Sequence, residues 1–159
     1  PPHIHTPGGR DKMGTQVRHL LRRKGTTVIT ISPTATVYET IDTMVDFGVG
    51  SIVVMNDGVP VGIFTERDYL RRIALQGRTS KTTRVDEVMT QNLLTVTPTT
   101  SLNTCLTLMS EARCRHLPVV VEGRLAGIVS MGDCVSALLR EAEATVDSLT
   151  RYVTGSDPV

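Results

Sequence analysis

Residues 62–68 read Gly-Ile-Phe-Thr-Glu-Arg-Asp, and residues 127–133 read Gly-Ile-Val-Ser-Met-Gly-Asp. Each stretch closes an apolar run with a hydroxyl residue and places an aspartate three positions later. The two aspartates are 65 residues apart, and the same shift without gaps superposes Pro33 on Pro98 and Gly58 on Gly123. Because proline, glycine and aspartate positions agree in one register, the sequence indicates two copies of one structural unit.

Each copy predicts the element order β-α-β-β-α. In the first copy a strand stops at Pro33, which has no N–H to donate to a sheet, and Thr36 then caps a helix. The apolar face expected for this helix is Val37, Ile41, Met44 and Val45. Strands are expected at 28–31, 51–55 and 60–64, a turn at 56–58 and a second helix at 67–75.

The second copy repeats this pattern with its own cap at Ser101. The apolar face of its first helix is expected at Leu102, Cys105, Leu106 and Met109. Strands are expected at 94–96, 117–121 and 125–129, and a last helix from 132 to about 153. The predicted fold class is therefore α/β (α+β), with two tandem β-α-β-β-α repeats related by pseudo-twofold symmetry.

These repeats set the expected domain boundaries. A flexible tail or leader is predicted at 1–16, the first repeat at 17–80, the second repeat with its long helix at 81–153, and a short tail at 154–159. The first repeat opens with a short basic helix at 17–24, and 85–89 is expected to form a helical turn that leads into the second copy.

Composition narrows the possible functions of the 159 residues. The net charge of +1, the absence of tryptophan and an aromatic content of 3% argue against a nucleic-acid surface. No apolar run approaches the ~20 residues of a membrane helix, so no membrane partner is predicted. Three cysteines without a paired spacing favour reduced thiols and a cytoplasmic location.

The last helix carries an additional apolar pattern. Its members are spaced alternately by four and three positions, which is the seam of a coiled coil: Val135, Leu139, Ala142, Val146, Leu149 and Val153. The part from Ala142 onward has no obvious partner within the repeat. The sequence therefore predicts a subunit contact along this helix.

The paired turns allow two interpretations. Thr65 with Asp68, and Ser130 with Asp133, can each form a capping box that has no role beyond starting a helix. The same geometry can hold a nucleotide, because an aspartate one turn into a helix after a strand can accept hydrogen bonds from a ribose diol. Arg67 could then contact phosphate. The spacing alone leaves both interpretations open.

The motifs resemble those of CBS-domain proteins, in particular stand-alone proteins with two CBS units in one Bateman module. The resemblance covers residues 17–140 and rests on the stretches at 62–72, 76–81, 88–90, 115–119 and 127–133. It includes a Thr-Glu-Arg-Asp turn and an Arg-His-Leu-Pro strand. It implies two units whose sheets pack together and leave two clefts, which in relatives bind AMP, ADP, ATP, NAD(H) or S-adenosylmethionine.

The resemblance also implies a set of nucleotide-binding residues. Asp68 and Asp133 would each bind a ribose, with support from Thr65 and Ser130, while Arg67, Arg115 and His116 would face phosphate. The cleft at Asp133 would include Lys24, Thr27, Ile29, Val49 and Gly50, with Ile128 against adenine. The cleft at Asp68 would include Met89, Asn92, Leu94 and Pro118.

The two clefts are not equivalent in sequence. Gly50 and Ser51 occupy the positions that Arg115 and His116 occupy in the second copy, and Arg67 corresponds to Gly132. The cations therefore come from opposite repeats, and one cleft is expected to bind an anion more tightly. Without the resemblance, His116 could equally be a hydrogen-bonded residue at a strand edge, and Cys114 with His116 provides only weak evidence for a metal site.

The sequence is compatible with three classes of function. The favoured one is a regulatory sensor that binds an adenine nucleotide (AMP, ATP or NAD(H)), with no catalytic cofactor, as a homodimer through its CBS faces and last helix. The alternative is a dimeric interaction module whose clefts stay empty. An enzyme is not predicted, because no nucleophile stands next to a base. With no further domain in the sequence, a separate regulated protein is the expected target.

Overall fold

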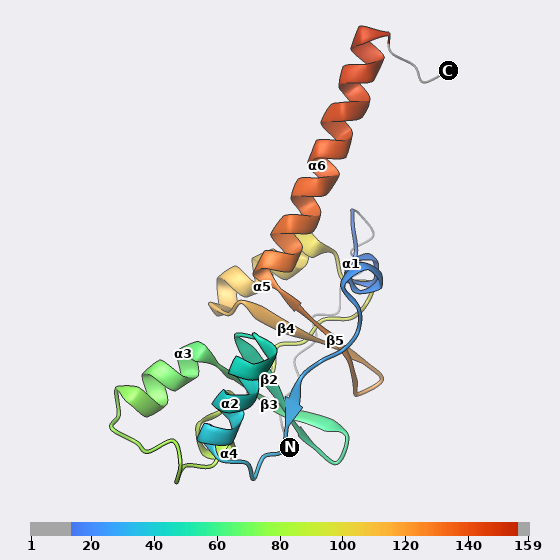
Figure 1. The fold of residues 1–159 in the computed structure, drawn as a ribbon. Coiled ribbons are helices and arrows are strands. Elements are labelled where there is room, and N and C mark those ends of the chain that lie inside the picture. Colours follow the sequence, from blue (N-terminus) through green and yellow to red (C-terminus); the bar gives the residue numbers. More distant parts are fainter. Residues whose placement is uncertain (1–13, 156–159) are drawn as a thin grey trace.

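The structure is a computed structural model that describes residues 14–155. Tails were predicted at 1–16 and 154–159; of these, residues 1–13 and 156–159 lie outside the described residues. The first half contains α1 (Val17–Lys24), β1 (Thr30–Ile31), α2 (Val37–Phe47), β2 (Ser51–Asn56), β3 (Val59–Thr65), α3 (Glu66–Asp68) and the π-helix η1 (Tyr69–Ala74). The second half contains α4 (Val85–Val88), α5 (Leu102–Ala112), β4 (His116–Val121), β5 (Arg124–Ser130) and α6 (Met131–Thr154) (Figure 1).

The two repeats form separate small sheets. In the first, β1 is parallel to β2 and β2 is antiparallel to β3; in the second, β4 is antiparallel to β5. The strand expected at 94–96 is reduced to one parallel bridge between Val96 and Val119. Both hairpins have a register shift at equivalent places, after Val54 and after Val119, which supports the repeat.

Two-residue turns close both hairpins. Asp57 and Gly58 have φ values of 50° and 78°, and Glu122 and Gly123 have 51° and 77°. Positive φ at both central positions matches the twist of the paired strands. The predicted turns are therefore confirmed, and the glycines allow the second left-handed position.

Helix caps were predicted correctly, but one core position was wrong. Thr36 Oγ1 accepts from Glu39 N at 3.1 Å, and Ser101 Oγ accepts from Thr104 N at 3.1 Å. In α2, Val37 and Met44 are buried, whereas Val45 is 72% exposed. Thr40 lies in the core instead, because its hydroxyl is satisfied by the carbonyl of Thr36 at 2.8 Å.

Each repeat begins with a short helix that packs in the core of the other repeat. Val17, Leu20 and Leu21 of α1 pack in the second core, with Cys105, Met109 and Cys134 among the buried residues there. Val85 and Val88 of α4 pack in the first core, beside Phe64. This exchange ties the two repeats together and brings their facing edges into contact.

The helix predicted at 67–75 has an unexpected form. One α-helical turn over Glu66–Asp68 changes directly into the π-helix η1. Leu75 N donates to Leu70 O at 3.0 Å and Arg78 N donates to Ile73 O at 3.1 Å, both five residues back. π-Helical segments are rare and occur frequently at functional sites.

α6 extends well beyond the rest of the fold (Figure 1). Cys134 near its start is buried, but Leu139 is 58%, Leu149 is 59% and Val153 is 82% exposed. The predicted seam is therefore present on the helix, and residues 141–155 are all exposed. Among residues 14–155, no helix is long and apolar enough to cross a membrane.

Candidate functional site

Both paired turns form capping boxes. Asp68 N donates to Thr65 Oγ1 at 3.1 Å, and Thr65 N donates back to Asp68 Oδ2 at 3.1 Å. The same reciprocal pair joins Ser130 and Asp133, at 3.0 Å in each direction. The structural interpretation of both turns is therefore confirmed. Each aspartate can also bind a further group, and the surroundings of the two carboxylates differ between the copies.

Asp68 lies at a cavity of about 450 Å³ between the two repeats. This volume falls within the ~300–1,000 Å³ typical of small-molecule sites. The lining residues come from the first repeat at Gly50, Ile63, Thr65, Glu66, Arg67, Asp68, Leu70, Arg71 and Arg72, from Thr90, and from the second repeat at Ala112, Arg113, Cys114, Arg115 and His116. A ligand in this cavity would therefore touch both units.

Asp68 is nearly buried, with 8% of the residue exposed, and hydrogen bonds hold its carboxylate in place. Its carboxylate accepts from the hydroxyl of Thr65 at 3.1 Å and from that of Thr90 at 3.2 Å. Arg72 Nε lies 3.9 Å away, and Arg72 Nη1 donates to the carbonyls of Val88 and Met89 at 2.9 Å each. Arg72 thus links Asp68 to the segment that enters the second repeat.

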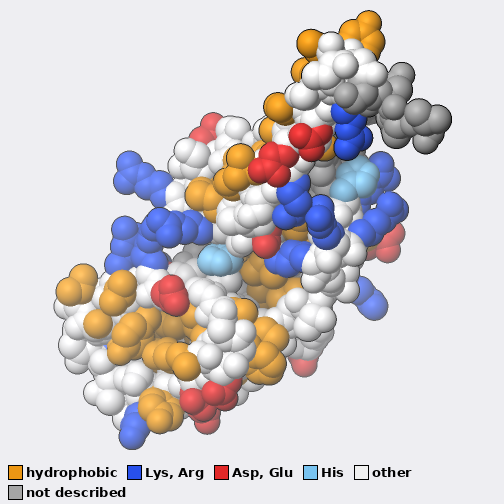
Figure 2. Space-filling model, turned by 45° about the horizontal axis from the view of Figure 1, so that its top comes forward, with side chains coloured by type: hydrophobic (Ala, Val, Ile, Leu, Met, Phe, Trp, Pro, Cys, Tyr) orange, Lys and Arg blue, Asp and Glu red, His pale blue; other side chains and the backbone are white. Residues whose placement is uncertain are grey.

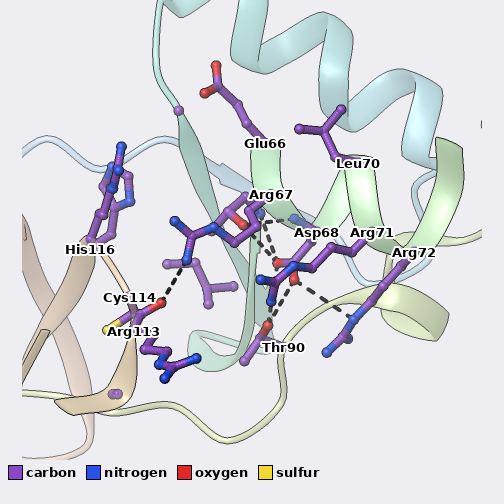
Figure 3. A pocket seen from close by; sticks show the side chains of 15 residues that line it. Glu66, Arg67, Asp68, Leu70, Arg71, Arg72, Thr90, Arg113, Cys114 and His116 are labelled. Carbon is purple, nitrogen blue, oxygen red and sulfur yellow. Dashed lines mark hydrogen bonds and ion pairs between the residues drawn. The ribbon is translucent and has the colours of Figure 1, made fainter. Parts of the chain in front are cut away.

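The arginines that line the cavity give it a positive charge. Arg67, Arg71, Arg72, Arg113 and Arg115 face two carboxylates, Glu66 and Asp68, so the lining has a net charge of +3 with His116 neutral. Arg67 Nη1 donates to the carbonyl of Arg113 at 3.0 Å and so connects the repeats (Figure 3). Lys and Arg side chains also gather along the boundary between the two lobes (Figure 2).

Asp133 has a different environment. Lys24 Nζ donates to Asp133 Oδ2 at 2.5 Å and to the carbonyl of Ile128 at 3.0 Å. Burial raises the pKa of Asp133, but the hydrogen bonds from Lys24 and Ser130 outweigh it, so the pKa lies below its ordinary value of 3.8. Lys24 of α1 thus occupies the carboxylate that the sequence assigns to a second ribose.

His116 stands between the two carboxylate regions. It lines the Asp68 cavity, and its Cε1 lies 3.8 Å from the position a Cβ would take on Gly50. Burial lowers its pKa below 6.5, and the charges of Lys24 and Arg115 act in the same direction against those of Asp133 and Glu66. These effects favour the neutral imidazole.

The structure brings together only some of the residues predicted for the two clefts. Around Asp68 it gathers Gly50, Thr65, Arg67, Arg115 and His116. The four residues expected there from the segment at 89–118 do not line the cavity. Met89 and Pro118 are buried, Leu94 packs against the second core and Asn92 is exposed. Thr90 takes their place.

The residues predicted for the other cleft are similarly divided. Lys24 reaches Asp133 and Ile128, whereas Ile29 and Val49 pack against the first core and Thr27 is exposed. Ser51 and Thr65 are paired across the first sheet, as His116 and Ser130 are across the second. Gly132 supplies no side chain where Arg67 stands in the first copy.

Several lining residues were missed from the sequence, chiefly Arg71, Arg113 and Thr90. Arg113 is close in sequence to the predicted Arg115, but its position depends on its own left-handed conformation (φ 53°), with which it ends α5. Arg71 lies on the π-helix, which a 3.6-residue pattern does not reveal. Among residues 14–155, no three His, Cys, Asp or Glu side chains gather in a way that could hold a metal ion.

Two repeated units with a shared cavity define a tandem-repeat module. The chain belongs to the CBS-domain family, whose model matches residues 17–75 and 85–140. The CBS domain-containing protein CBSX3, mitochondrial, of Arabidopsis thaliana is 42% identical over 125 residues, which are 76% of this chain and 61% of that protein. The match thus spans less than two thirds of that relative.

Solved structures agree with this assignment. A candidate signal-transduction protein with CBS domains from Burkholderia ambifaria has a TM-score of 0.77 and 40% identity, covering 79% of this chain and 95% of that one. A hexameric CBS-CP12 protein from bloom-forming cyanobacteria has a TM-score of 0.69 and 29% identity, covering 77% and 71%. The tandem CBS pair is a signal-transduction and regulatory module.

Proposed function

We propose that this protein is a regulatory sensor that binds an adenine nucleotide (AMP, ATP or NAD(H)) in the cavity beside Asp68. One observation carries the proposal: a single cavity combines a fixed, nearly buried carboxylate with arginines from both repeats. The carboxylate suits a ribose diol, and guanidinium groups suit phosphate. A smaller cavity between α1 and α6 also contains arginines and a carboxylate, but that carboxylate, Glu141, is exposed, and the cavity beside α2 contains no arginine.

In this proposal the ribose hydroxyls donate to Asp68, whose orientation is set by Thr65 and Thr90. Ile63 provides apolar lining, and Arg67, Arg115 and His116 face the phosphate end. Because these groups belong to both repeats, the bound nucleotide favours one packing of the repeats over others. A ligand shifts such an equilibrium only by its difference in affinity for the two states.

The Asp133 cleft is assigned a secondary role. Lys24 already neutralises its carboxylate, so a ribose there would have to share or displace the ammonium group. We therefore place the first binding event at Asp68. Binding at Asp133 with Lys24 as a ligand contact stays a prediction from the sequence.

The deciding experiment is a calorimetric titration of the nucleotide-free protein with AMP, ATP, NADH and S-adenosylmethionine. Absorbance and intact mass establish beforehand that no nucleotide remains bound. Binding of at least one adenine nucleotide at micromolar concentration is expected. The absence of heat with all four ligands would refute the sensor function and leave the interaction module.

That alternative is favoured by two exposed apolar surfaces. One covers α2 and η1, beside a second cavity of about 670 Å³, and includes Val45, Phe47 and Leu70 at 72%, 62% and 58% exposure. The other is the seam of α6, and both are visible as hydrophobic patches in Figure 2. We propose that a second copy of this chain covers them in a homodimer; a related CBS-CP12 protein is hexameric.

The remaining assignments follow from this function. We propose that the protein is not itself an enzyme, needs no catalytic cofactor and acts in the cytoplasm on a separate regulated protein. Cys114 and His116 both line the cavity, but burial raises the pKa of the Cys114 thiol, so it is not an activated nucleophile, and residues 14–155 contain no metal-binding cluster that would support a reaction there.

A further inference from the structure

We infer that the cavity beside Asp68 selects a nucleoside polyphosphate over a monophosphate, through Arg67, Arg71, Arg113 and Arg115. This inference rests on the proposed function and adds the ligand class within it. The sequence motifs pointed to only two of these arginines. The other two, Arg71 and Arg113, join them only in the folded structure.

The arginines of the cavity fall into two groups. Arg72 is engaged with the carbonyls of Val88 and Met89 and lies 3.9 Å from Asp68, so it serves the carboxylate. None of the other four forms an ion pair with a carboxylate of residues 14–155. We call these four guanidinium groups the arginine cluster. Arg67 Nη1 already donates to the carbonyl of Arg113, but none of the four is neutralised by a carboxylate, so their other N–H groups can bind an anion.

The arginine cluster is drawn from both sides of the cavity. Arg67 and Arg71 come from α3 and η1, whereas Arg113 and Arg115 come from the turn after α5. Figure 3 shows Arg67 reaching toward the turn at Arg113, with Arg71 beside Asp68, while Glu66 points away from Asp68. A chain of phosphates that starts near the Asp68 end can contact both sides.

Charge matching favours more than one phosphate. A phosphomonoester carries about −1.5 to −2 charges at pH 7, and each further phosphate of a chain adds about −1. A triphosphate thus approaches the charge of the arginine cluster, whereas AMP leaves about half of it unmatched. S-adenosylmethionine has no phosphate, and the pyrophosphate bridge of NAD, esterified at both ends, carries only about two negative charges.

The binding is expected to depend on salt. All four members of the arginine cluster are exposed, so added salt weakens their attraction to phosphate, and the attraction is largely screened beyond a Debye length of about 8–10 Å at about 0.1–0.15 M ionic strength. Each contact between an exposed arginine and phosphate therefore contributes little binding free energy. Discrimination between ATP and AMP comes from several such contacts with one ligand. We expect ATP to bind about tenfold more tightly than AMP in 0.1 M salt.

The test is a calorimetric series on the full chain with AMP, ADP, ATP and inorganic triphosphate. The variant is Arg71→Ala/Arg113→Ala, which removes one cation from each side. The matched control is Arg124→Ala/Arg151→Ala, which removes the same charge from exposed positions outside the cavity. The wild type is expected to rank ATP above ADP and ADP above AMP. The cavity variant should reduce the ATP preference to about twofold, and the control should retain it.

The outcomes separate this inference from the proposed function. If AMP binds as tightly as ATP, or both double variants reduce the preference equally, the inference fails while nucleotide binding stands. If inorganic triphosphate binds but no adenine nucleotide does, the arginine cluster is a polyphosphate site and the nucleotide function fails. If nothing binds, both are wrong.

Discussion

Replacing Asp68 with alanine separates the two roles of its carboxylate. In the free protein Asp68 closes a capping box with Thr65, accepts from Thr90 and lies near Arg72. Loss of such a cap costs about 1 kcal/mol. The Arg72 side chain is 43% exposed, so that ion pair contributes at most about 1 kcal/mol more. The expected loss of unfolding free energy is thus about 1–2 kcal/mol, or roughly 2–8 °C in Tm.

The effect on binding should be larger. Hydrogen bonds that involve a charged group contribute about 1.5–3 kcal/mol, so the affinity for AMP or ATP should fall about 10- to 150-fold. Affinity is measured by calorimetry, and stability by thermal unfolding followed by circular dichroism without ligand, because bound ligand would raise Tm by itself.

Asp133→Ala is the matched control. It removes the equivalent capping box with Ser130 and also the partner of Lys24, so its Tm should fall by a similar amount. Asp133 does not line the Asp68 cavity, and the affinity there should change less than about twofold. If both variants lower Tm and neither weakens binding, Asp68 is only a helix cap. If both weaken binding equally, the ligand is not held at Asp68.

Three further predictions concern packing, pH and assembly. Gly62→Ala places a Cβ 2.9 Å from Met89 Cγ and in overlap with its Sδ, so urea unfolding should show a loss of about 1–3 kcal/mol that Met89→Ala partly restores. The absence of any restoration would refute this overlap. Burial holds the pKa of His116 below 6.5, so the unfolded chain takes up its proton first. The unfolding free energy should therefore fall as pH drops below 6.5, and His116→Gln should weaken that dependence; an unchanged pH profile would contradict it. Leu149→Glu on the exposed seam of α6 should weaken self-association at least about tenfold in sedimentation experiments, while circular dichroism shows the repeats still folded, whereas a wild-type monomer would refute the proposed dimer.

Much of the fold was predictable because its signals are local. The 65-residue repeat, the caps at Thr36 and Ser101 and the hairpin turns at 56–58 and 122–123 each depend on residues close in sequence. Hydroxyl caps and positive-φ glycines act within one turn of the chain, so their effect can be read without the partner elements. The two aspartates were identified for the same reason.

The differences between the two clefts were decided by contacts between distant residues. Lys24 and Asp133 are more than one hundred positions apart, and the exchange of α1 and α4 between the cores brings such pairs together. The sequence predicted that the clefts would differ but could not show that one carboxylate would be occupied by a lysine.

By itself the sequence determined the repeat, its element order, the paired Asp turns and the apolar seam of the last helix. Only the tertiary structure decided which arginines share a cavity, which predicted contacts are buried instead, and where η1 directs Arg71. The physical reason is that caps and turns are stabilised by bonds a few residues long. A cationic cavity instead depends on side chains that two separate sheets and their exchanged helices bring to one place.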